Sequence, residues 1–411
     1  MTETDSQNMS QKRRARVQVA AELKIPDRVP MIGFAGDIVA AYAGFTNYEV
    51  NFDFDKARQA AVKYLQDFPS EISMAGLSGV NNIVPALAFS DSPDVAQGLS
   101  TINGPVHDIL KDKYSRFPGR ELSENSSSQF VGGTYMQPEE YDEYIDDPVK
   151  FSFEKILPRT TENLNPIYSS KAMATMIKVG MEKARQGNEM RTMFTDLMQM
   201  GFPSLPMGFG YAPLDYIGDY LRDIPNLILD LRKYPDKVKA AAEATVAPII
   251  KLALSSKAMG APFAFFPLHL NEYLSPKLYK EFYWPTLKEV IVRLMDEGIK
   301  SHVFFEGRHD AHLETILELP RGWGIAYFEK TDVRKAKKVL KGHSCVCGGL
   351  QASMVIGGTP EEIDRYIKEL LEEVMPGGGF ILAPDVAALP RETPIENLRA
   401  VYEAVEKYAY Y

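Results

Sequence analysis

Short apolar runs alternate with longer amphipathic stretches along the chain from about residue 260 onward. A run of strand length followed by a stretch of helical length, repeated, favours parallel strands joined by right-handed crossovers. Five such units follow one another, and their apolar runs are PFAFFPLHL, HVFF, WGIAYF, SCVCGGL and GFILAP. This repetition predicts an α/β fold of the (β/α)8 TIM-barrel type. An open doubly wound sheet is the alternative, although no run is followed by a glycine-rich turn of the dinucleotide or P-loop kind.

The length of 411 residues and the hydrophobic content of 45% suffice for one large barrel with an N-terminal elaboration. We expect a polar helical segment over residues 1–25 and a single barrel over residues 26–411, with RVPMIGFAG as its first strand. Residues 91–137 are rich in Ser, Pro, Gly and Asn. They predict a long loop inserted over the barrel mouth, with a disordered surface loop as the alternative.

Charge and composition exclude several classes of partner. The formal net charge is −9 and basic residues do not cluster with aromatic ones, so we expect no binding to nucleic acid. No apolar run is long enough to span a bilayer, and the N-terminus lacks the apolar core of a secretory signal, so we expect a cytoplasmic protein without a membrane partner. Cys345 and Cys347, on a predicted strand, are interpreted as small core residues.

Polar residues at the ends of the apolar runs are the candidates for chemistry, because the carboxyl ends of barrel strands surround the reaction site. Glu306 ends the run HVFF and is the first catalytic candidate, partly desolvated by Phe304 and Phe305. The alternative is a solvated loop acid or an ion-pair partner of Arg308. The other polar residues that end or closely follow an apolar run are Asp37, His269, His302, Glu329 and Asp385.

Methionine and phenylalanine residues cluster between residues 190 and 209. Such surfaces line adaptable apolar pockets, although an ordinary core has the same composition. The predicted substrate contacts combine this region with the strand ends, and they are Asp37, Met207, Phe209, Tyr211, His269, Phe304 and Arg308.

Several motifs in the second half of the chain resemble those of the uroporphyrinogen decarboxylase superfamily. They are DYLRDIPNLILDLRKYPDKV, LSPKLYKEFYWPTLKEVI, HVFFEG, GGTPEEID, GGGFILAPD and TPIENLRAVYEAV. The resemblance implies a (β/α)8 barrel and one of two chemistries. One branch of the superfamily decarboxylates the acetate arms of a tetrapyrrole without a cofactor. The other uses zinc to move methyl groups between corrinoid proteins and thiols or other acceptors.

The chain departs from both branches at the residues that carry their chemistry. The decarboxylases have an arginine-rich RQAGRY signature where this chain has MIGFAGDIVAAY, so their carboxylate-binding arginines are lost. The thiol-directed methyltransferases have a His-x-Cys pair and a later cysteine that together suit tetrahedral zinc. Here the histidine survives as His302, but Phe304 replaces the first cysteine and residues 384–386 replace the second. The chain is therefore nearer the methyltransferase branch without its zinc site, and any zinc would not be thiolate-bound.

The expected function is methyl transfer from a small O- or N-methylated compound to a corrinoid on a separate protein. Glu306 would protonate the leaving group, with His302 and Asp385 orienting it and Glu329 as the alternative acid. His302, His309 and His312 fall within eleven residues, which suits a metal site with Glu306, Glu329 and Asp385. The alternative is that His309 and His312 cap or solvate the start of the following helix. The expected partners are a corrinoid-binding protein and a small methyl donor, and a homodimer is one expected assembly.

The alternative function is a cofactor-independent decarboxylase or lyase that acts on a carboxylated aromatic compound. Such an enzyme would need an arginine clamp for the carboxylate. Arg222 and Arg308 are the candidates for that clamp.

Overall fold

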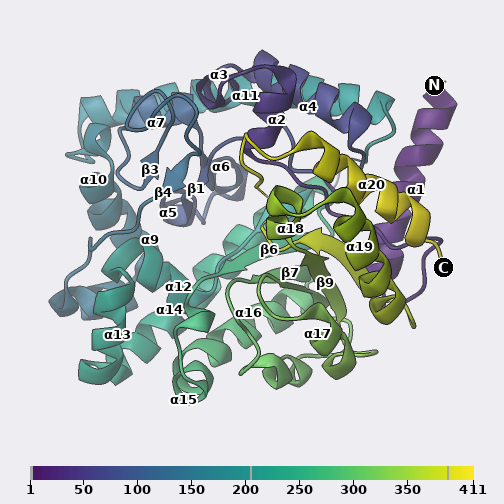
Figure 1. Cartoon of the computed structure of the whole chain (residues 1–411). Helices are drawn as coiled ribbons and strands as arrows, with labels where there is room; N and C mark the ends of the chain where they lie inside the picture. The colour runs from purple at the N-terminus through teal and green to yellow at the C-terminus, as the bar shows by residue number, and fades with distance from the viewer. Residues whose placement is uncertain (1–2, 204–205, 387) are drawn as a thin grey trace. The chain divides into compact units, whose positions relative to one another are not determined.

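The computed structural model describes residues 3–203, 206–386 and 388–411 (Figure 1). The chain divides into two compact units. Unit 1 comprises Met1–Ser78, Asn188–Leu205 and Val303–Tyr411, and unit 2 comprises Gly79–Gly187 and Pro206–His302. In sequence, the boundaries fall inside strand β7 (Lys300–Phe305) and helix α11 (Ser170–Gln199).

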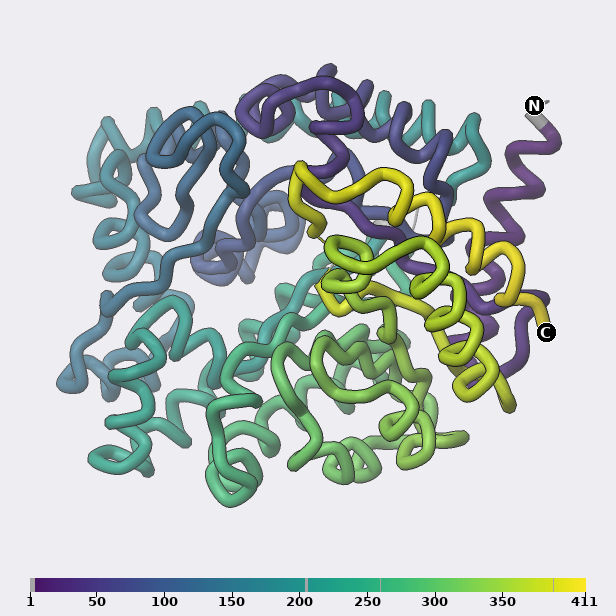
Figure 2. The backbone as a smooth tube through the Cα atoms, in the orientation of Figure 1, coloured from purple at the N-terminus to yellow at the C-terminus, as the bar shows by residue number. Residues whose placement is uncertain are grey.

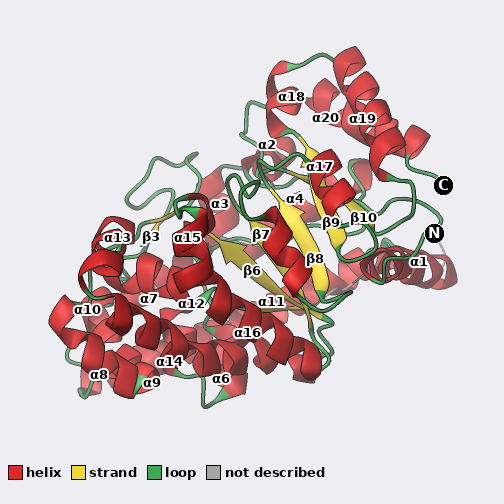
Figure 3. Ribbon diagram, turned by 90° about the horizontal axis from the view of Figure 1, so that it is seen from below, coloured by secondary structure: helices red, strands yellow, loops and turns green. Residues whose placement is uncertain are grey.

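Unit 1 contains three neighbouring parallel strands, which Figure 3 shows as adjacent arrows. They are β8 (Gly324–Phe328), β9 (Cys345–Leu350) and β10 (Phe380–Pro384). Cys347 lies opposite Tyr327 on one side and Ile381 on the other. Every residue of β8 and β10 is buried. This is the pattern of parallel strands that helices cover on both faces.

The predicted first strand continues this arrangement as isolated bridges. Met31 pairs with Leu382 and Ala35 with Ala388, both in parallel, and Ile32 pairs in parallel with Ile72. The run RVPMIGFAG therefore lies beside β10. Figure 2 shows the C-terminal end beside the segment that follows α1 (Glu3–Ala21), where Arg28 bridges to Tyr410.

Helices α19 (Pro360–Val374) and α20 (Ile395–Tyr408) pack against each other in unit 1. A capping box between Thr359 and Glu362 begins α19, with Pro360 in the first turn. Its buried residues recur at helical spacing and form one apolar stripe. They are Ile363, Ile367, Leu370, Leu371 and Val374.

Unit 2 contains the parallel strands β5 (Met207–Phe209) and β6 (Phe263–Leu268), with Phe209 opposite Phe265. The segment 91–137 is more structured than the predicted long loop. It contains α6 (Pro93–Gly98), β2 (Thr101–Ile102), α7 (Gly104–Leu110), β3 (Ser115–Arg116) and β4 (Gln129–Phe130). These short elements form because the segment contains apolar side chains that are buried, even though its composition is rich in Ser and Gly. The buried side chains include Val106, Leu110, Tyr114 and Phe117.

The predicted α/β class with parallel strands is confirmed, and all five predicted strands after residue 260 form. Two of the amphipathic stretches that follow the apolar runs do not form single regular α-helices. The stretch 276–297 forms α15 (Pro276–Leu278), a π-helical turn η7 (Tyr279–Tyr283) and α16 (Trp284–Asp296), because Pro285 has no N–H to donate. The stretch 310–319 is the 3₁₀ helix η8 (Leu313–Glu318). Within the described residues, no helix is both long enough and apolar enough to cross a bilayer.

Candidate active site

Two buried aspartates follow strand β5 in unit 2. The chain turns into α12 (Pro213–Tyr216), which Pro213 begins, and continues as the π-helical segment η4 (Ile217–Arg222). Asp215 and Asp219 are four positions apart, so they share one face of this helical segment. Asp215 is 0% and Asp219 4% exposed. π-helical turns often occur at functional sites. Because the two carboxylates are buried away from water, they need hydrogen-bond donors from the protein.

Asp219 is the centre of a three-residue hydrogen-bond network. Tyr211 Oη donates to Asp219 Oδ2 at 2.7 Å, and His269 Nδ1 lies 2.6 Å from the same oxygen. Because an ionised carboxylate only accepts hydrogen bonds, Nδ1 carries the proton and the neutral ring would have its lone pair on Nε2. The His269 side chain is 30% exposed, whereas that of Asp219 is 4% exposed. The imidazole is therefore the accessible member, and the carboxylate behind it fixes its orientation and stabilises its charged form.

Asp215 is held by a different set of donors. Tyr283 Oη donates to Asp215 Oδ2 at 2.6 Å, and the backbone N–H groups of His269 and Leu270 donate at 3.2 and 2.9 Å. Burial, reinforced by the charge of Asp219, raises the pKa of Asp215 to about 7. Burial also raises the pKa of Tyr283 well above its usual value, so this phenol stays protonated. Asp215 can thus hold an exchangeable proton near neutral pH, and it lies beside His269.

The segment around Tyr114 and Phe130 covers the Asp219 turn within unit 2. Tyr114 Oη donates to the backbone carbonyl of Tyr220, and the ring of Phe130 packs on Tyr220 at 5.1 Å between centroids. A side chain at Gly132 would come within 3.2 Å of the carbonyl oxygen of Asp219. This close approach of backbone, which glycine permits, excludes water from the buried side of the network.

Four of the predicted site residues meet in unit 2. The ring of Phe209 lies 6.3 Å from those of Tyr211 and Phe265, and Phe265 meets the edge of His302 at 5.6 Å. Tyr211 in turn contacts His269. Burial lowers the pKa of His302 to about 4, so this ring is neutral near pH 7. His302 can support the aromatic surface but cannot supply a positive charge there.

Glu306, Glu329 and Asp385 directly follow strands in unit 1, as their positions after apolar runs predict. Glu329 accepts a hydrogen bond from the backbone N–H of Gly307 at 2.5 Å. Asp385 Oδ1 accepts from the backbone N–H groups of Ala352 and Val386 at 2.8 and 2.7 Å. These carboxylates tie loops together at the strand ends. Glu306 is half-buried in the same region.

The remaining predicted substrate contacts are dispersed. Asp37 is the first residue of α2 (Asp37–Ala43), where a negative charge stabilises the helix N-terminus. Phe304 packs on the ring of Tyr327 at 4.4 Å, whereas Met207 is half-buried on β5 and Arg308 is exposed.

Three other predictions are affected by the structure. Arg222 is buried and pairs with Asp230 at 2.6 Å, so its assignment to a carboxylate clamp is wrong. His309 and His312 are both buried, so the prediction that they are solvated is wrong. The rings of Phe305 and His312 pack on His309 at 4.2 and 5.4 Å between centroids, and His312 stands at the N-cap of η8 without a side-chain capping hydrogen bond. The described residues include no group of three or more His, Cys, Asp or Glu side chains placed to hold a metal ion.

The sequence predictions did not include Asp215, Asp219 or Tyr283. A signal for the aspartates was available, since PLDYIGDY places two acids four residues apart just after a strand. Tyr283 had no comparable local signal.

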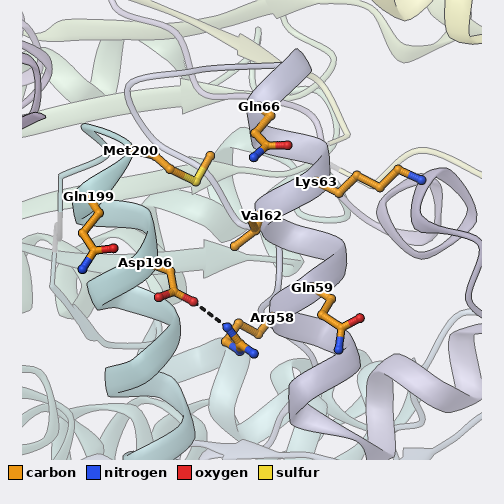
Figure 4. Close-up of a pocket in the computed structure, with 8 residues that line it drawn as sticks. All are labelled: Arg58, Gln59, Val62, Lys63, Gln66, Asp196, Gln199 and Met200. Carbon is orange, nitrogen blue, oxygen red and sulfur yellow. Dashed lines mark hydrogen bonds and ion pairs between the residues drawn. The ribbon is translucent and has the colours of Figure 1, made fainter. Parts of the chain in front are cut away.

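A surface groove of about 400 Å³ lies elsewhere in unit 1, between α4 (Phe54–Asp67) and the end of α11 (Figure 4). Arg58 and Asp196 form an ion pair across it at 2.6 Å. Six of its eight lining residues are polar or charged, and none of the eight is a predicted site residue. Because binding sites for small molecules are usually apolar with few polar groups, we place the candidate chemistry at the Asp219 network and not here.

A family model and one solved structure agree with this fold. Residues 205–408 match the family model described as uroporphyrinogen decarboxylase (URO-D). A methyltransferase from Methanosarcina mazei aligns over 96% of this chain and 98% of its own, with 14% identity and a TM-score of 0.59. A B12-independent methionine synthase from Shewanella sp. W3-18-1 aligns over 48% of this chain and 61% of its own, with 14% identity and a TM-score of 0.36. No curated protein matches the chain by sequence.

The likeness to the Methanosarcina protein shows a shared fold, and at 14% identity it shows no more than that. The family match begins just before β5 and ends at the last residue of α20, so it includes Asp215, Asp219 and His269. The predicted resemblance is therefore confirmed, and the portion of the chain from residue 205 to residue 408 belongs to the uroporphyrinogen decarboxylase superfamily.

Proposed function

We propose that the protein is a methyltransferase that moves a methyl group from a small O- or N-methylated compound to a corrinoid carried by a separate protein. The observation that carries the proposal is the 2.6 Å contact between Asp219 and the partly exposed His269. Such a pair is suited to deliver a proton from the accessible ring nitrogen. The superfamily membership of residues 205–408 and the fold shared with a methyltransferase support the reaction class.

The leaving group defines the task of these residues. When its carrier protein is bound, the corrinoid would supply a reduced cobalt that accepts the methyl group. The donor's oxygen or nitrogen keeps the electron pair of the broken bond and needs a proton. His269 would donate that proton from Nε2, while Asp219 stabilises the imidazolium from the other side of the ring. Asp215 would hold the proton that restores the network, since its pKa of about 7 allows both protonation states.

The residues do not fit a thiolate-bound zinc ion. The two cysteines of the chain are both buried on β9, and burial raises the pKa of the Cys347 thiol well above its usual value. A thiol held in its neutral form is a poor metal ligand. No step of this proposal passes through zinc.

Methylation of free cob(I)alamin tests the proposal directly. The purified protein would be offered a panel of methoxylated aromatic compounds and methylamines, and methylcobalamin would be followed by its absorbance. We expect turnover with at least one donor and a loss of about two to four orders of magnitude in His269→Gln. Turnover of a carboxylated aromatic compound to carbon dioxide without any corrinoid would favour the decarboxylase instead. That alternative is weakened by the pairing of Arg222 with Asp230.

A further inference from the structure

A buried histidine lies between two carboxylates in unit 2, outside the Asp219 network. Nδ1 of His107, on helix α7, lies 2.7 Å from Asp112 Oδ2, and Nε2 of the same ring lies 3.1 Å from Glu121 Oε1. The side chains of His107 and Asp112 are 4% and 1% exposed, whereas that of Glu121 is 40% exposed. The two carboxylates face opposite nitrogens of one ring, so the three groups cannot converge on a metal ion.

This geometry requires a proton on both ring nitrogens. Asp112 Oδ1 accepts hydrogen bonds from the backbone N–H groups of Tyr114 and Ser115, both at 3.0 Å, which favours the ionised carboxylate. Glu121 Oε2 accepts from the backbone N–H of Phe117 at 3.1 Å, and its carboxylate is open to water. Because ionised carboxylates only accept hydrogen bonds, each ring nitrogen must donate one. The ring is therefore an imidazolium.

The charges around the ring favour this protonated form. Burial alone would lower the pKa of His107, but the hydrogen bonds and charges of Asp112 and Glu121 outweigh it and raise the pKa above its ordinary value of 6.5. The other charged side chains on α7, on η3 (Glu162–Leu164), which packs against it, and on the neighbouring turns are Asp108, Lys111, Lys113, Arg116, Arg120 and Glu162.

One of these charges offers a second tie to the same turn. Arg120 pairs with Asp108 at 2.6 Å, but both side chains are about one third exposed, at 33% and 31%. Ion pairs open to solvent contribute little to stability. The contact between Glu121 and the buried His107 is therefore the stronger link between α7 and this turn.

Glu121 belongs to a hairpin that covers part of the candidate active site. Strands β3 and β4 and the loop between them form this hairpin, residues 115–130, which we call the covering hairpin. Figure 1 shows it beside α7. At its end, the ring of Phe130 packs on Tyr220 in η4, the segment that carries Asp219. Through Glu121, the histidine thus fastens to α7 a segment that shields the buried carboxylates from water.

Loss of one proton from the ring would break one of its two contacts. The contact with Asp112 is shorter and more deeply buried, so Nδ1 keeps its proton. Nε2 would then present a lone pair to Glu121 Oε1, and two acceptors repel each other. Because Glu121 is exposed, its carboxylate can turn to water.

We propose that His107 is a pH-sensitive latch, which fastens the covering hairpin to α7 while its ring is charged and releases the hairpin when the ring is neutral. The inference is independent of the chemistry assigned to His269. Because the folded pKa of His107 lies above the unfolded value, the stabilisation is complete below about pH 6.5 and is lost as pH rises through the folded value. The hairpin should therefore loosen in mildly alkaline solution.

Amide hydrogen exchange of the full chain between about pH 6 and pH 9 tests the latch. Protection factors, which correct for the faster intrinsic exchange at high pH, should fall about tenfold or more in peptides from residues 115–131 as pH rises. Peptides from α14 (Pro235–Leu254), also in unit 2, are the control and should keep their protection. Protection of the hairpin that stays constant, or that falls only in parallel with α14, would overturn the proposal.

The variant Glu121→Gln separates a latch from an ordinary structural contact. A neutral His107 can donate from Nδ1 to Asp112 and accept at Nε2 from the amide of the new side chain, so the contact no longer needs the second proton. The hairpin should then stay protected up to about pH 9. Glu124→Gln is the matched control, because it removes the same charge from an exposed position of the same hairpin and should retain the native pH dependence. A native fall in protection in Glu121→Gln would overturn the latch.

Nuclear magnetic resonance of the histidine rings follows the proton itself. The His107 signals, assigned by their loss in His107→Gln, should titrate with a midpoint above 6.5 in the native protein and at lower pH in Glu121→Gln. If His107→Gln fails to fold, the signal whose midpoint differs between native protein and Glu121→Gln provides the assignment. A His107 midpoint below 6.5, or one that Glu121→Gln leaves unchanged, would overturn the proposal.

Discussion

Acidic residues follow parallel strands in both units, yet their hydrogen-bond partners differ. In unit 1, Glu329 and Asp385 accept hydrogen bonds from backbone N–H groups. In unit 2, Asp219 accepts from a phenol and an imidazole, and Asp215 accepts from a second phenol as well as from the backbone. Backbone donors cannot exchange protons usefully near neutral pH, whereas imidazole can. The carboxylates that follow strands in unit 1 thus hold loops in place through backbone hydrogen bonds. Those in unit 2 are candidates for carrying a proton.

The largest expected effect is on activity at His269. The variant His269→Gln keeps a donor for Asp219 but cannot deliver a proton, so methyl transfer to cob(I)alamin should fall by about two to four orders of magnitude. His343→Gln is the matched control, because His343 contacts Ser344 and the carbonyl of Leu319 and takes no part in the network. Near-native turnover by a folded His269→Gln protein would remove His269 from the chemistry.

The pH dependence of stability should expose the buried Asp215. Its folded pKa of about 7 lies above its usual value of 3.8. The folded state therefore binds the proton more tightly, and stability falls as pH rises from about 4 to 7. Asp215→Asn, which cannot ionise, should flatten this dependence. Urea unfolding of both proteins at pH 5 and pH 8 measures the difference, and parallel pH profiles would contradict the raised pKa.

The hydrogen bonds that Asp385 accepts from the backbone should contribute to the stability of the fold more than to catalysis. Asp385→Ala leaves the N–H groups of Ala352 and Val386 without the carboxylate, which should cost about 0.5–1.5 kcal/mol in the free energy of unfolding. Asp385→Asn retains an accepting oxygen and should recover most of that loss. A strongly inactive but fully stable Asp385→Asn protein would instead return Asp385 to the catalytic set.

The smallest effect should come from Glu306, the acid that the sequence places first. If His269 is the proton donor, Glu306→Gln should lower methyl transfer by less than about tenfold. This measurement shows whether the acid of unit 1 or the histidine network of unit 2 supplies the proton. A fall of two to four orders of magnitude with unchanged stability would transfer the role of acid from unit 2 to Glu306.

Local sequence determined most of the secondary structure and the position of the candidate residues along it. The apolar runs form β6 to β10, and the polar residues that end them, including His269 and Glu306, directly follow those strands. This succeeds because strand and helix periodicity are local properties of the chain. The secondary structure of segment 91–137 was harder to predict from the sequence. A few buried apolar residues order it, although its composition is typical of a loop.

The tertiary structure decided which of these residues act together. Asp219 meets His269, which is 50 positions away, and Asp215 meets Tyr283, which is 68 positions away. Arg222 has the charge of a carboxylate clamp, but its burial against Asp230 makes it structural. Hydrogen-bond partners and burial depend on contacts between distant segments, which hydrophobic periodicity does not encode. The sequence therefore predicts that acids follow the strands. The fold decides which acids bind backbone N–H groups, as Glu329 and Asp385 do, and which belong to a proton-carrying network, as Asp215 and Asp219 do.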